Sequence, residues 1–275
     1  MLELNDHLSA HLPKDNTFDW LLNVEGKVHR AVKNRRTVEF EIGGRRYFIK
    51  IHRGVGWREI LKNVTYGRAP IMSAENEWRA IDQLRQLGIP SLTLAGIGKR
   101  GSPPAWLESF VITEALDGMI SLEDLTHDWR GVGDPQRIRL KRAFIKRLAE
   151  IARVMHSAGL NHRDFYLCHF LVRDRVWTAW NPAEPLELFI IDLHRVQIRE
   201  RVPERWLVKD LGGLLFSALD AGLTRRDLLR FVKIYRQRSV REVLEDEALF
   251  WAKVWENAVH LYEPFHGRPV PLRLK

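Results

Sequence analysis

The residues best suited to chemistry lie near the middle of the chain, in His162-Arg163-Asp164 and, five residues after the Asp, His169. In phosphoryl transfer, a His-Arg-Asp triplet supplies the carboxylate that receives the proton of the acceptor hydroxyl, and an Asn five residues later holds a magnesium ion. His169 stands where that Asn is expected. A triplet alone also arises by chance, so this interpretation depends on further groups elsewhere in the chain.

Phosphoryl transfer also needs a cation near the nucleotide phosphates and a carboxylate that fixes this cation. Lys50 lies in an alternating segment that predicts a strand, on the same face as Phe48, where it either points to phosphates or faces solvent. Glu77 is its predicted partner and Glu75 is the competing choice. The two cannot share the role, because residues two apart do not lie on one helix face.

A magnesium ligand is predicted at Asp192, which follows the apolar strand 188–191. A carboxylate at the end of a buried strand is unfavourable unless it binds something, although capping a turn is an alternative. His169 has three open roles: a metal ligand, a donor to a phosphate, or a residue that holds the loop. Its neighbour Cys168 is not expected to share a ligand with it, because successive side chains of a strand point to opposite faces.

Hydrophobic periodicity indicates the elements that must position these groups. Alternation predicts a hairpin of residues 37–42 and 45–51 around Gly43-Gly44. A helix over 73–87 and strands over 92–97 and 106–114 complete a small sheet with one helix. From residue 134 the spacing becomes helical, and we expect helices over 134–158, 209–219, 225–236 and 240–262.

The order of these elements predicts an α+β fold with two lobes. Residues 1–115 form the expected nucleotide-binding lobe, and residues 116–275 form the expected catalytic and substrate-binding lobe. Asp210 lies where a kinase fold uses an Asp to brace the catalytic loop.

The net charge of +9 arises from one region, since residues 26–68 hold 12 Lys/Arg and 3 Asp/Glu. Such a region attracts nucleotide phosphates, anionic lipid head groups, nucleic acid or an acidic protein, or is simply a solvated surface. No zinc-finger spacing or RNA-binding signature is present, and we expect no nucleic-acid partner. A single cysteine excludes an intrachain disulfide, and no apolar run approaches about 18 residues, so we expect a soluble cytoplasmic protein.

Two departures from the kinase pattern bear on the substrates. Residues 25–30 contain one glycine and several cations in place of a glycine-rich loop, which makes Lys27 a candidate phosphate contact. Residues 193–209 contain no Ser, Thr or Tyr and no Ala-Pro-Glu, yet they carry Arg195, Arg199 and Arg201. This segment cannot be activated by its own phosphorylation, and its charge favours an anionic acceptor other than a protein.

Several motifs together resemble one family, the lipopolysaccharide core heptose(I) kinases known as WaaP or RfaP, over nearly the full length of the chain. The motifs are Tyr47-Phe48-Ile49-Lys50 with His52-Arg53-Gly54, Ile112-Thr113-Glu114, Ile120-Ser121-Leu122-Glu123-Asp124, Asn161-His162-Arg163-Asp164 with Cys168-His169-Phe170, Ile191-Asp192-Leu193-His194-Arg195, Arg201-Val202-Pro203 and Lys209-Asp210-Leu211.

The resemblance implies a protein-kinase-like fold that uses ATP and Mg²⁺ to phosphorylate the 4-hydroxyl of the first heptose of the inner core. It makes Asp164 the base and Lys50 and Glu77 the phosphate-positioning pair. Asp192 becomes a metal ligand, and His169 in place of Asn becomes a family trait. The adenine-contacting hinge would comprise Glu114, Ala115 and Leu116.

The implied acceptor is an acidic sugar chain on an anionic lipid, so the resemblance also implies peripheral contact with the cytoplasmic face of the inner membrane. Candidate sugar and anion contacts are Trp57, Arg58, Lys62, Tyr66 and Arg68, with the arginines of 195–205. Trp57 and Tyr66 packing in the core is the alternative. The competing hypotheses for the whole chain are a protein kinase or pseudokinase scaffold and a basic nucleic-acid-binding module.

Overall fold

The computed structural model describes residues 1–32, 34–54, 73–101, 106–127, 129 and 134–272. They form two compact units. The first comprises Met1–Gln83, Ser91–Asp117 and Leu193–Arg195, and the second comprises Leu84–Pro90, Gly118–Asp192 and Val196–Lys275. The functional division into lobes after residue 115 stays a prediction.

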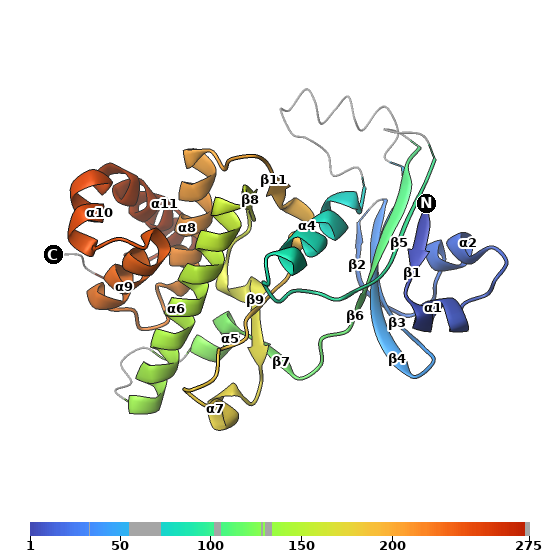
Figure 1. Ribbon diagram of the computed structural model, residues 1–275, viewed down its shortest axis with the longest axis horizontal. Helices are drawn as coiled ribbons and strands as arrows, with labels where there is room; N and C mark the ends of the chain where they lie inside the picture. The colour runs from blue at the N-terminus through green and yellow to red at the C-terminus, as the bar shows by residue number, and fades with distance from the viewer. Residues whose placement is uncertain (33, 55–72, 102–105, 128, 130–133, 273–275) are drawn as a thin grey trace. The chain divides into compact units, whose positions relative to one another are not determined.

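The first unit contains a six-stranded antiparallel sheet with the strand order β1-β5-β6-β4-β3-β2 (Figure 1). Its strands are β1 (Leu2–Leu4), β2 (Lys27–Val32), β3 (Arg35–Ile42), β4 (Arg45–His52), β5 (Leu94–Arg100) and β6 (Glu108–Glu114). The predicted hairpin is β3 and β4. Its turn requires glycine, because Gly43 and Gly44 have φ of 58° and 72°, as a two-residue turn that matches strand twist demands.

Helices cover both faces of this sheet (Figure 1). Helices α1 (Asp6–His11) and α2 (Thr17–Leu22) pack apolar side chains such as Leu8 and Leu21 onto the face that carries Ile49. Helix α4 (Glu75–Gln86), expected from the sequence, lies on the opposite face. Neither α1 nor α2 was expected, because six residues are too few to display a helical period.

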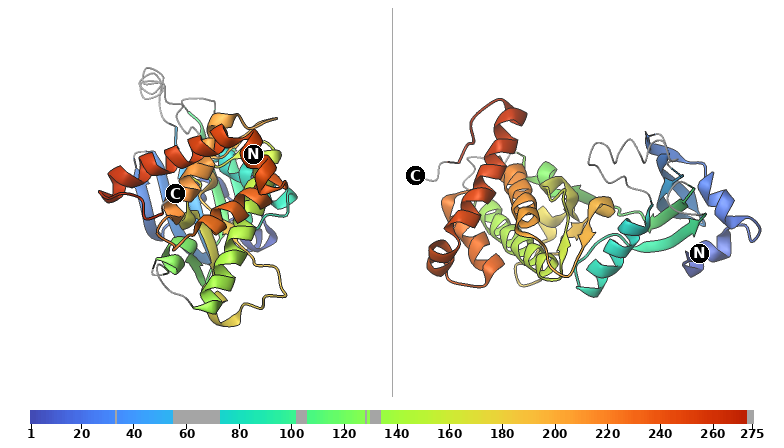
Figure 2. Two further views of the ribbon diagram at one scale, coloured as in Figure 1. Left: turned by 90° about the vertical axis from the view of Figure 1, so that its left-hand side faces the viewer. Right: turned by 90° about the horizontal axis from the view of Figure 1, so that it is seen from above.

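The second unit is mainly helical and carries two small sheets. Helix α6 packs against α9, and α8 packs along α11 (Figure 2). The helices are α5 (Leu122–Thr126), α6 (Pro135–Ser157), α7 (Val176–Ala179), α8 (Glu204–Ala218), α9 (Arg225–Arg236), α10 (Val240–Asp246) and α11 (Ala248–His266). The sheets pair β7 (Met119–Ser121), β9 (Phe170–Arg173) and β10 (Phe189–Ile190), and separately β8 (Leu160–Asn161) and β11 (Gln197–Ile198). Together the two units confirm the α+β class.

Two predictions about the second unit were wrong in detail. The single helix expected over 240–262 is two helices, because Glu247 leaves the helical region at φ −125° and ψ 20°. Cys168 and His169 do not lie in a strand, since Leu167–His169 forms a short 3₁₀ turn. Helix α10 begins with a capping box, in which the Ser239 side chain accepts from the Glu242 N–H and the Glu242 side chain accepts from the Ser239 N–H.

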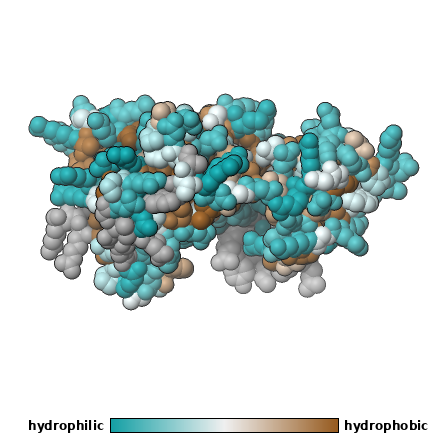
Figure 3. All heavy atoms as spheres, turned by 90° about the horizontal axis from the view of Figure 1, so that it is seen from below, coloured by the Kyte–Doolittle hydropathy of each residue, from teal (hydrophilic) through white to brown (hydrophobic). Residues whose placement is uncertain are grey.

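No helix in the described residues is long and apolar enough to cross a membrane. On the face shown in Figure 3, hydrophilic residues predominate and hydrophobic ones occur between them in separate patches.

Candidate active site

The predicted catalytic loop, residues 162–169 of the second unit, is fixed through its backbone. Asp210, fully buried in α8, accepts hydrogen bonds from the backbone N–H of His162 (2.6 Å) and of Arg163 (2.8 Å). Arg163 has φ of 74°, a left-handed conformation that is unfavourable for a non-glycine residue. The two hydrogen bonds to a carboxylate compensate for this strain. The bracing role expected for Asp210 is therefore visible in its contacts.

The side chain of His169 links Asp164 to Asp192. Its Nδ1 lies 2.7 Å from the Asp164 backbone carbonyl, and its Nε2 lies 3.5 Å from Asp192 Oδ2. Because a carbonyl oxygen only accepts, Nδ1 must carry the proton. In the neutral ring, Nε2 then presents a lone pair toward a carboxylate. The structure thus brings the three predicted residues together from two segments, the loop after β8 and the end of β10.

This arrangement fits a divalent cation. Metal-bound histidines usually donate their other ring N–H to a carbonyl or carboxylate, as His169 does. Asp192 supplies the oxygen ligand that Mg²⁺ prefers, and its φ of 60° shows that its backbone is also strained. In the described part of the chain, no three His, Cys, Asp or Glu side chains form a metal-binding group. Mg²⁺ would therefore also need nucleotide phosphates and water as ligands.

His162 is fully buried, and its Nε2–H donates to the Ile191 carbonyl at 3.1 Å. Burial lowers the pKa of His162, so the ring is neutral at physiological pH. It ties the catalytic loop to the residue before Asp192, which is a positioning contact. Burial, together with Glu123, raises the pKa of Cys168 to about 11, so this thiol is protonated and unsuited to metal binding.

Behind the loop, two further residues support Asp210 that sequence reasoning missed. His156 contacts Asp210 Oδ2 through Nε2 (3.4 Å) and the Tyr235 hydroxyl through Nδ1 (2.9 Å). Burial raises the pKa of Tyr235, which keeps this hydroxyl protonated. A histidine and a tyrosine on the apolar faces of two separate helices give no sequence signal that they meet.

In the first unit, Lys50 Nζ donates to Glu77 Oε1 at 2.6 Å. The Glu77 side chain is 1% exposed, so this ion pair is shielded from water on its carboxylate side. Glu75, the competing candidate, instead pairs with Lys99 and Arg79 at 2.5 Å each. The geometry therefore selects Glu77 as the partner of Lys50.

His52 lies at the end of β4, two residues after Lys50, and is buried. Burial lowers its pKa to about 4, and the positive charge of Arg35 and the neighbouring His194 and Lys50 contribute in the same direction. His52 is consequently neutral at physiological pH and adds no charge beside Lys50.

The predicted hinge continues β6. Glu114 donates its backbone N–H to the Thr93 carbonyl, and Ala115 donates its own to the Arg46 carbonyl, each at 3.0 Å. An adenine base bound along this segment would therefore need another backbone donor, and Leu116 is the remaining predicted residue. Lys27 lies exposed on the edge strand β2, opposite Glu39.

The predicted substrate-binding cations are distributed between several places. Arg58, Lys62 and Arg68, with Trp57 and Tyr66, lie outside the described residues. Arg195 belongs to the first unit, to which its segment is joined by Asn76 Nδ2 donating to the His194 carbonyl.

The other two predicted cations, Arg199 and Arg201, follow β11 in the second unit, and Arg201 is exposed. Arg199 Nη1 donates to Asn161 Oδ1 at 2.8 Å, and Asn161 directly precedes the predicted catalytic triplet.

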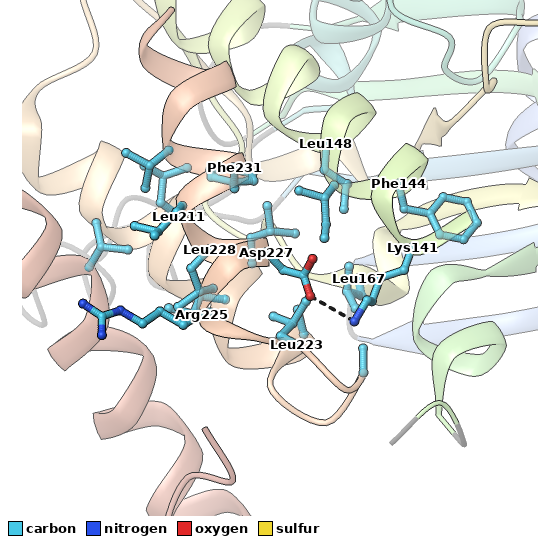
Figure 4. Close-up of a pocket in the computed structure, with 18 of the residues that line it drawn as sticks. Lys141, Phe144, Leu148, Leu167, Leu211, Leu223, Arg225, Asp227, Leu228 and Phe231 are labelled. Atoms are coloured by element: carbon cyan, nitrogen blue, oxygen red, sulfur yellow. Dashed lines mark ion pairs between the residues drawn. The ribbon is translucent and has the colours of Figure 1, made fainter. Parts of the chain in front are cut away.

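A separate cavity of about 350 Å³ lies among the helices of the second unit (Figure 4). Apolar side chains such as Leu148, Leu211 and Phe231 line it almost completely. The Lys141–Asp227 ion pair (2.9 Å) and Arg225 are the charged groups in its lining. Nothing in the sequence indicated this cavity, because its lining residues come from six different helices and from the segments between them.

Comparison with known proteins gives consistent matches. The model of the lipopolysaccharide kinase (Kdo/WaaP) family matches residues 19–235. The chain is 46% identical over 246 residues to the lipopolysaccharide core heptose(I) kinase WaaP of Pseudomonas aeruginosa, covering 90% of each chain. It is 42% identical over 247 residues to the Escherichia coli protein of the same description, covering 90% of this chain and 91% of that one.

A solved structure described as WaaP in complex with acyl carrier protein matches with a TM-score of 0.81 and 40% identity, over 96% of this chain and all of that one. This likeness, with the antiparallel sheet of the first unit and the helices of the second, confirms the protein-kinase-like fold.

Proposed function

The chain belongs to the lipopolysaccharide kinase (Kdo/WaaP) family, and we propose that it phosphorylates the 4-hydroxyl of the first heptose of the lipopolysaccharide inner core, with ATP and Mg²⁺. One structural observation carries the proposal. A loop held in a strained conformation by Asp210 presents Asp164 next to His169 and Asp192. The alternative, a protein kinase or pseudokinase scaffold, is not favoured by the named relatives.

Asp164 is the proposed base. As the heptose oxygen attacks the γ-phosphorus, a P–O bond to the sugar forms, the bond to the β-phosphate oxygen breaks, and the hydroxyl proton passes to the Asp164 carboxylate. ADP leaves with the bridging oxygen. His162 and Arg163 keep the carboxylate in place through their backbone bonds to Asp210.

The nucleotide is held by residues of the first unit in this proposal. Lys50 carries the positive charge for the phosphates, and Glu77 fixes its position. Glu114, Ala115 and Leu116 contact adenine, and Lys27 contributes charge in place of a glycine-rich loop. Asp192 and His169 would hold Mg²⁺. When bound, this ion would neutralise part of the negative charge of the nucleotide phosphates.

The substrate assignment is tested with two acceptors. Purified protein, Mg²⁺ and ATP labelled in the γ-phosphate are incubated with core lipopolysaccharide that contains heptose and with the same material lacking it. Label should enter only the first acceptor, and phosphorus NMR of the product should place the phosphate on the 4-position. Equal labelling of both acceptors, or labelling of neither, would contradict the assignment.

We also propose an acyl carrier protein as a partner, because a structural relative is described in such a complex. The apolar cavity would receive the acyl chain, because its volume and apolar lining suit a hydrocarbon chain. Burial of each methylene of that chain would stabilise the complex by about 0.8 kcal/mol. Filling it by Leu148→Trp should weaken binding of the acylated carrier and not of the unacylated one. Leu249→Trp, at an exposed position, is the matched control; equal affinity of both variants for the acylated carrier would refute the site.

The proposed location is the cytoplasmic face of the inner membrane, where this acceptor would be met. Cations of α9 such as Arg226 and Lys233 would contact anionic head groups. Flotation with vesicles containing anionic lipid should bring the protein to the top fraction at low salt, and neutral vesicles should not. Equal recovery with both kinds of vesicle would contradict contact through these cations.

A further inference from the structure

Four cationic side chains surround one indole ring in the second unit. Around Trp206, the charged groups of Arg163, Arg199, Arg205 and Lys209 lie 5.0, 5.9, 5.3 and 5.4 Å from the ring. We call these five residues the Trp206 cluster. Arg205, Trp206 and Lys209 come from the start of α8, whereas Arg163 directly precedes Asp164.

The backbone fixes the two arginines that come from outside α8. Arg163 is held at φ 74° by Asp210. The Arg199 N–H donates to the Gly159 carbonyl at 3.0 Å, and the Arg199 carbonyl would lie 1.7 Å from a Cβ atom at Gly159. Only glycine permits this approach, which places Arg199 against the segment that leads into the catalytic loop.

The cluster concentrates positive charge. Cation–π contacts with Trp206 offset part of the repulsion between the four cations. Glu204, the acidic residue in the first turn of α8, pairs with Lys253 at 2.7 Å instead. The indole N–H of Trp206 is enclosed and has no hydrogen-bond partner among the described residues. A bound anion would supply acceptor oxygens to the guanidinium groups of Arg199 and Arg205.

The anion cannot come from a modified residue of the adjoining segment. In many kinases, arginines near the catalytic loop bind a phosphate on the activation segment. Here residues 193–209 contain no Ser, Thr or Tyr. An anion bound at the cluster would therefore belong to a ligand and not to a phosphorylated residue of this segment.

We infer that the Trp206 cluster binds a carboxylate or phosphate group of the lipopolysaccharide acceptor and so aligns the acceptor hydroxyl with Asp164. The planar, forked guanidinium groups of Arg163 and Arg199 suit both kinds of anion. This inference rests on the proposed function. It adds that the residues of the Trp206 cluster determine the specificity for the acceptor.

The first test compares Arg199→Gln/Arg205→Gln with Arg241→Gln. Arg241 lies on α10 with its side chain 88% exposed, so it controls for lost surface charge. The double variant should raise KM for the acceptor about tenfold and leave KM for ATP unchanged, since two charge-assisted contacts are lost. Arg199→Lys/Arg205→Lys should recover part of the loss. A wild-type acceptor KM in the Gln variant overturns the inference.

A second test measures binding without ATP, by calorimetry with core oligosaccharide. The wild type should bind at least about tenfold more tightly than the double Gln variant. Acceptor with reduced carboxyl groups and acceptor with phosphates removed distinguish the two anions. Weaker binding of one of these two altered acceptors supports the inference and shows whether the cluster binds a carboxylate or a phosphate. Unchanged binding of both altered acceptors overturns the inference. Cluster-dependent binding without phosphate transfer by the wild type would refute the proposed function alone.

Discussion

The most informative single substitution is Asp210→Asn. The two oxygens of the Asp210 carboxylate each accept one backbone N–H, from His162 at 2.6 Å and from Arg163 at 2.8 Å. An asparagine amide of the same shape offers only one acceptor oxygen. One of the two N–H groups would then face an NH₂ group, and the left-handed backbone of Arg163 would lose a partner that stabilises it.

The expected loss of stability follows from this geometry. A buried donor left without an acceptor is destabilising by about 1–3 kcal/mol, and replacing a charged acceptor by a neutral one adds about 1 kcal/mol. The sum, about 2–4 kcal/mol, corresponds to a fall of about 5–10 °C in Tm for a unit of this size. Displacement of the loop by about 1 Å would lower kcat about 100-fold, because transfer requires aligned reactants.

Calorimetry measures Tm, and steady-state phosphate transfer measures kcat and both KM values. Asp220→Asn is the matched control. Asp220 accepts a hydrogen bond from the Tyr262 hydroxyl at 2.8 Å near the C-terminal helix, so its variant should lose stability without a comparable loss of kcat. If Asp210→Asn lowers Tm but retains wild-type kcat, the reasoning that links this carboxylate to the catalytic loop is wrong.

Three further predictions concern other groups. Glu77→Gln should lower kcat at least about tenfold, because Lys50 loses its charged partner. Glu75→Gln should leave kcat unchanged, because Glu75 pairs with Lys99. Steady-state kinetics with ATP measure both variants, and equal losses of kcat would contradict the Lys50–Glu77 pairing. Burial lowers the pKa of His52 to about 4 in the folded protein, so protonation of His52 favours the unfolded chain. The contribution of His52 to the free energy of unfolding should therefore be fully present above pH 6.5 and fall by about 3 kcal/mol as the pH approaches 4. Urea unfolding at several pH values should show that His52→Gln flattens the pH dependence of the free energy of unfolding. The same pH dependence in the variant and the wild type would refute the role of His52. Asp192→Asn should weaken Mn²⁺ binding with a nonhydrolysable ATP analogue about tenfold or more by electron paramagnetic resonance, and unaltered binding would remove Asp192 from the metal site.

Local patterns in the sequence predicted those parts of the fold that depend on neighbouring residues. The alternation around Gly43-Gly44 gave the β3–β4 hairpin, and it placed Lys50 on the face opposite Ile49. Apolar spacing gave α6 and α9 nearly to their ends. In these segments the period, the turn and the cap residues all favour one structure.

Short or interrupted elements could not be predicted in this way. The break at Glu247 lies within a continuous helical pattern, and the turn at Cys168 and His169 has no sequence signal that separates it from a strand. The turn has a functional consequence, because it brings the His169 ring to both the Asp164 carbonyl and Asp192.

Contacts between distant segments were the least predictable part of the candidate site. The sequence placed Asp210 behind the catalytic loop but gave no reason to join His156 and Tyr235 to it. The sequence indicated Arg199 as an anion contact, yet not that it meets Arg163 across Trp206. These pairings depend on how whole helices pack, which a local pattern does not contain.

The central claim is that Asp164 accepts the proton of the acceptor hydroxyl. Its most direct test is single-turnover transfer of the labelled γ-phosphate of ATP to heptose-containing core lipopolysaccharide by the wild type and by Asp164→Asn. The variant should bind ATP and acceptor with wild-type affinity and transfer phosphate about 10²- to 10⁴-fold more slowly, which is the range for loss of a general base. Transfer by Asp164→Asn at the wild-type rate would contradict the account.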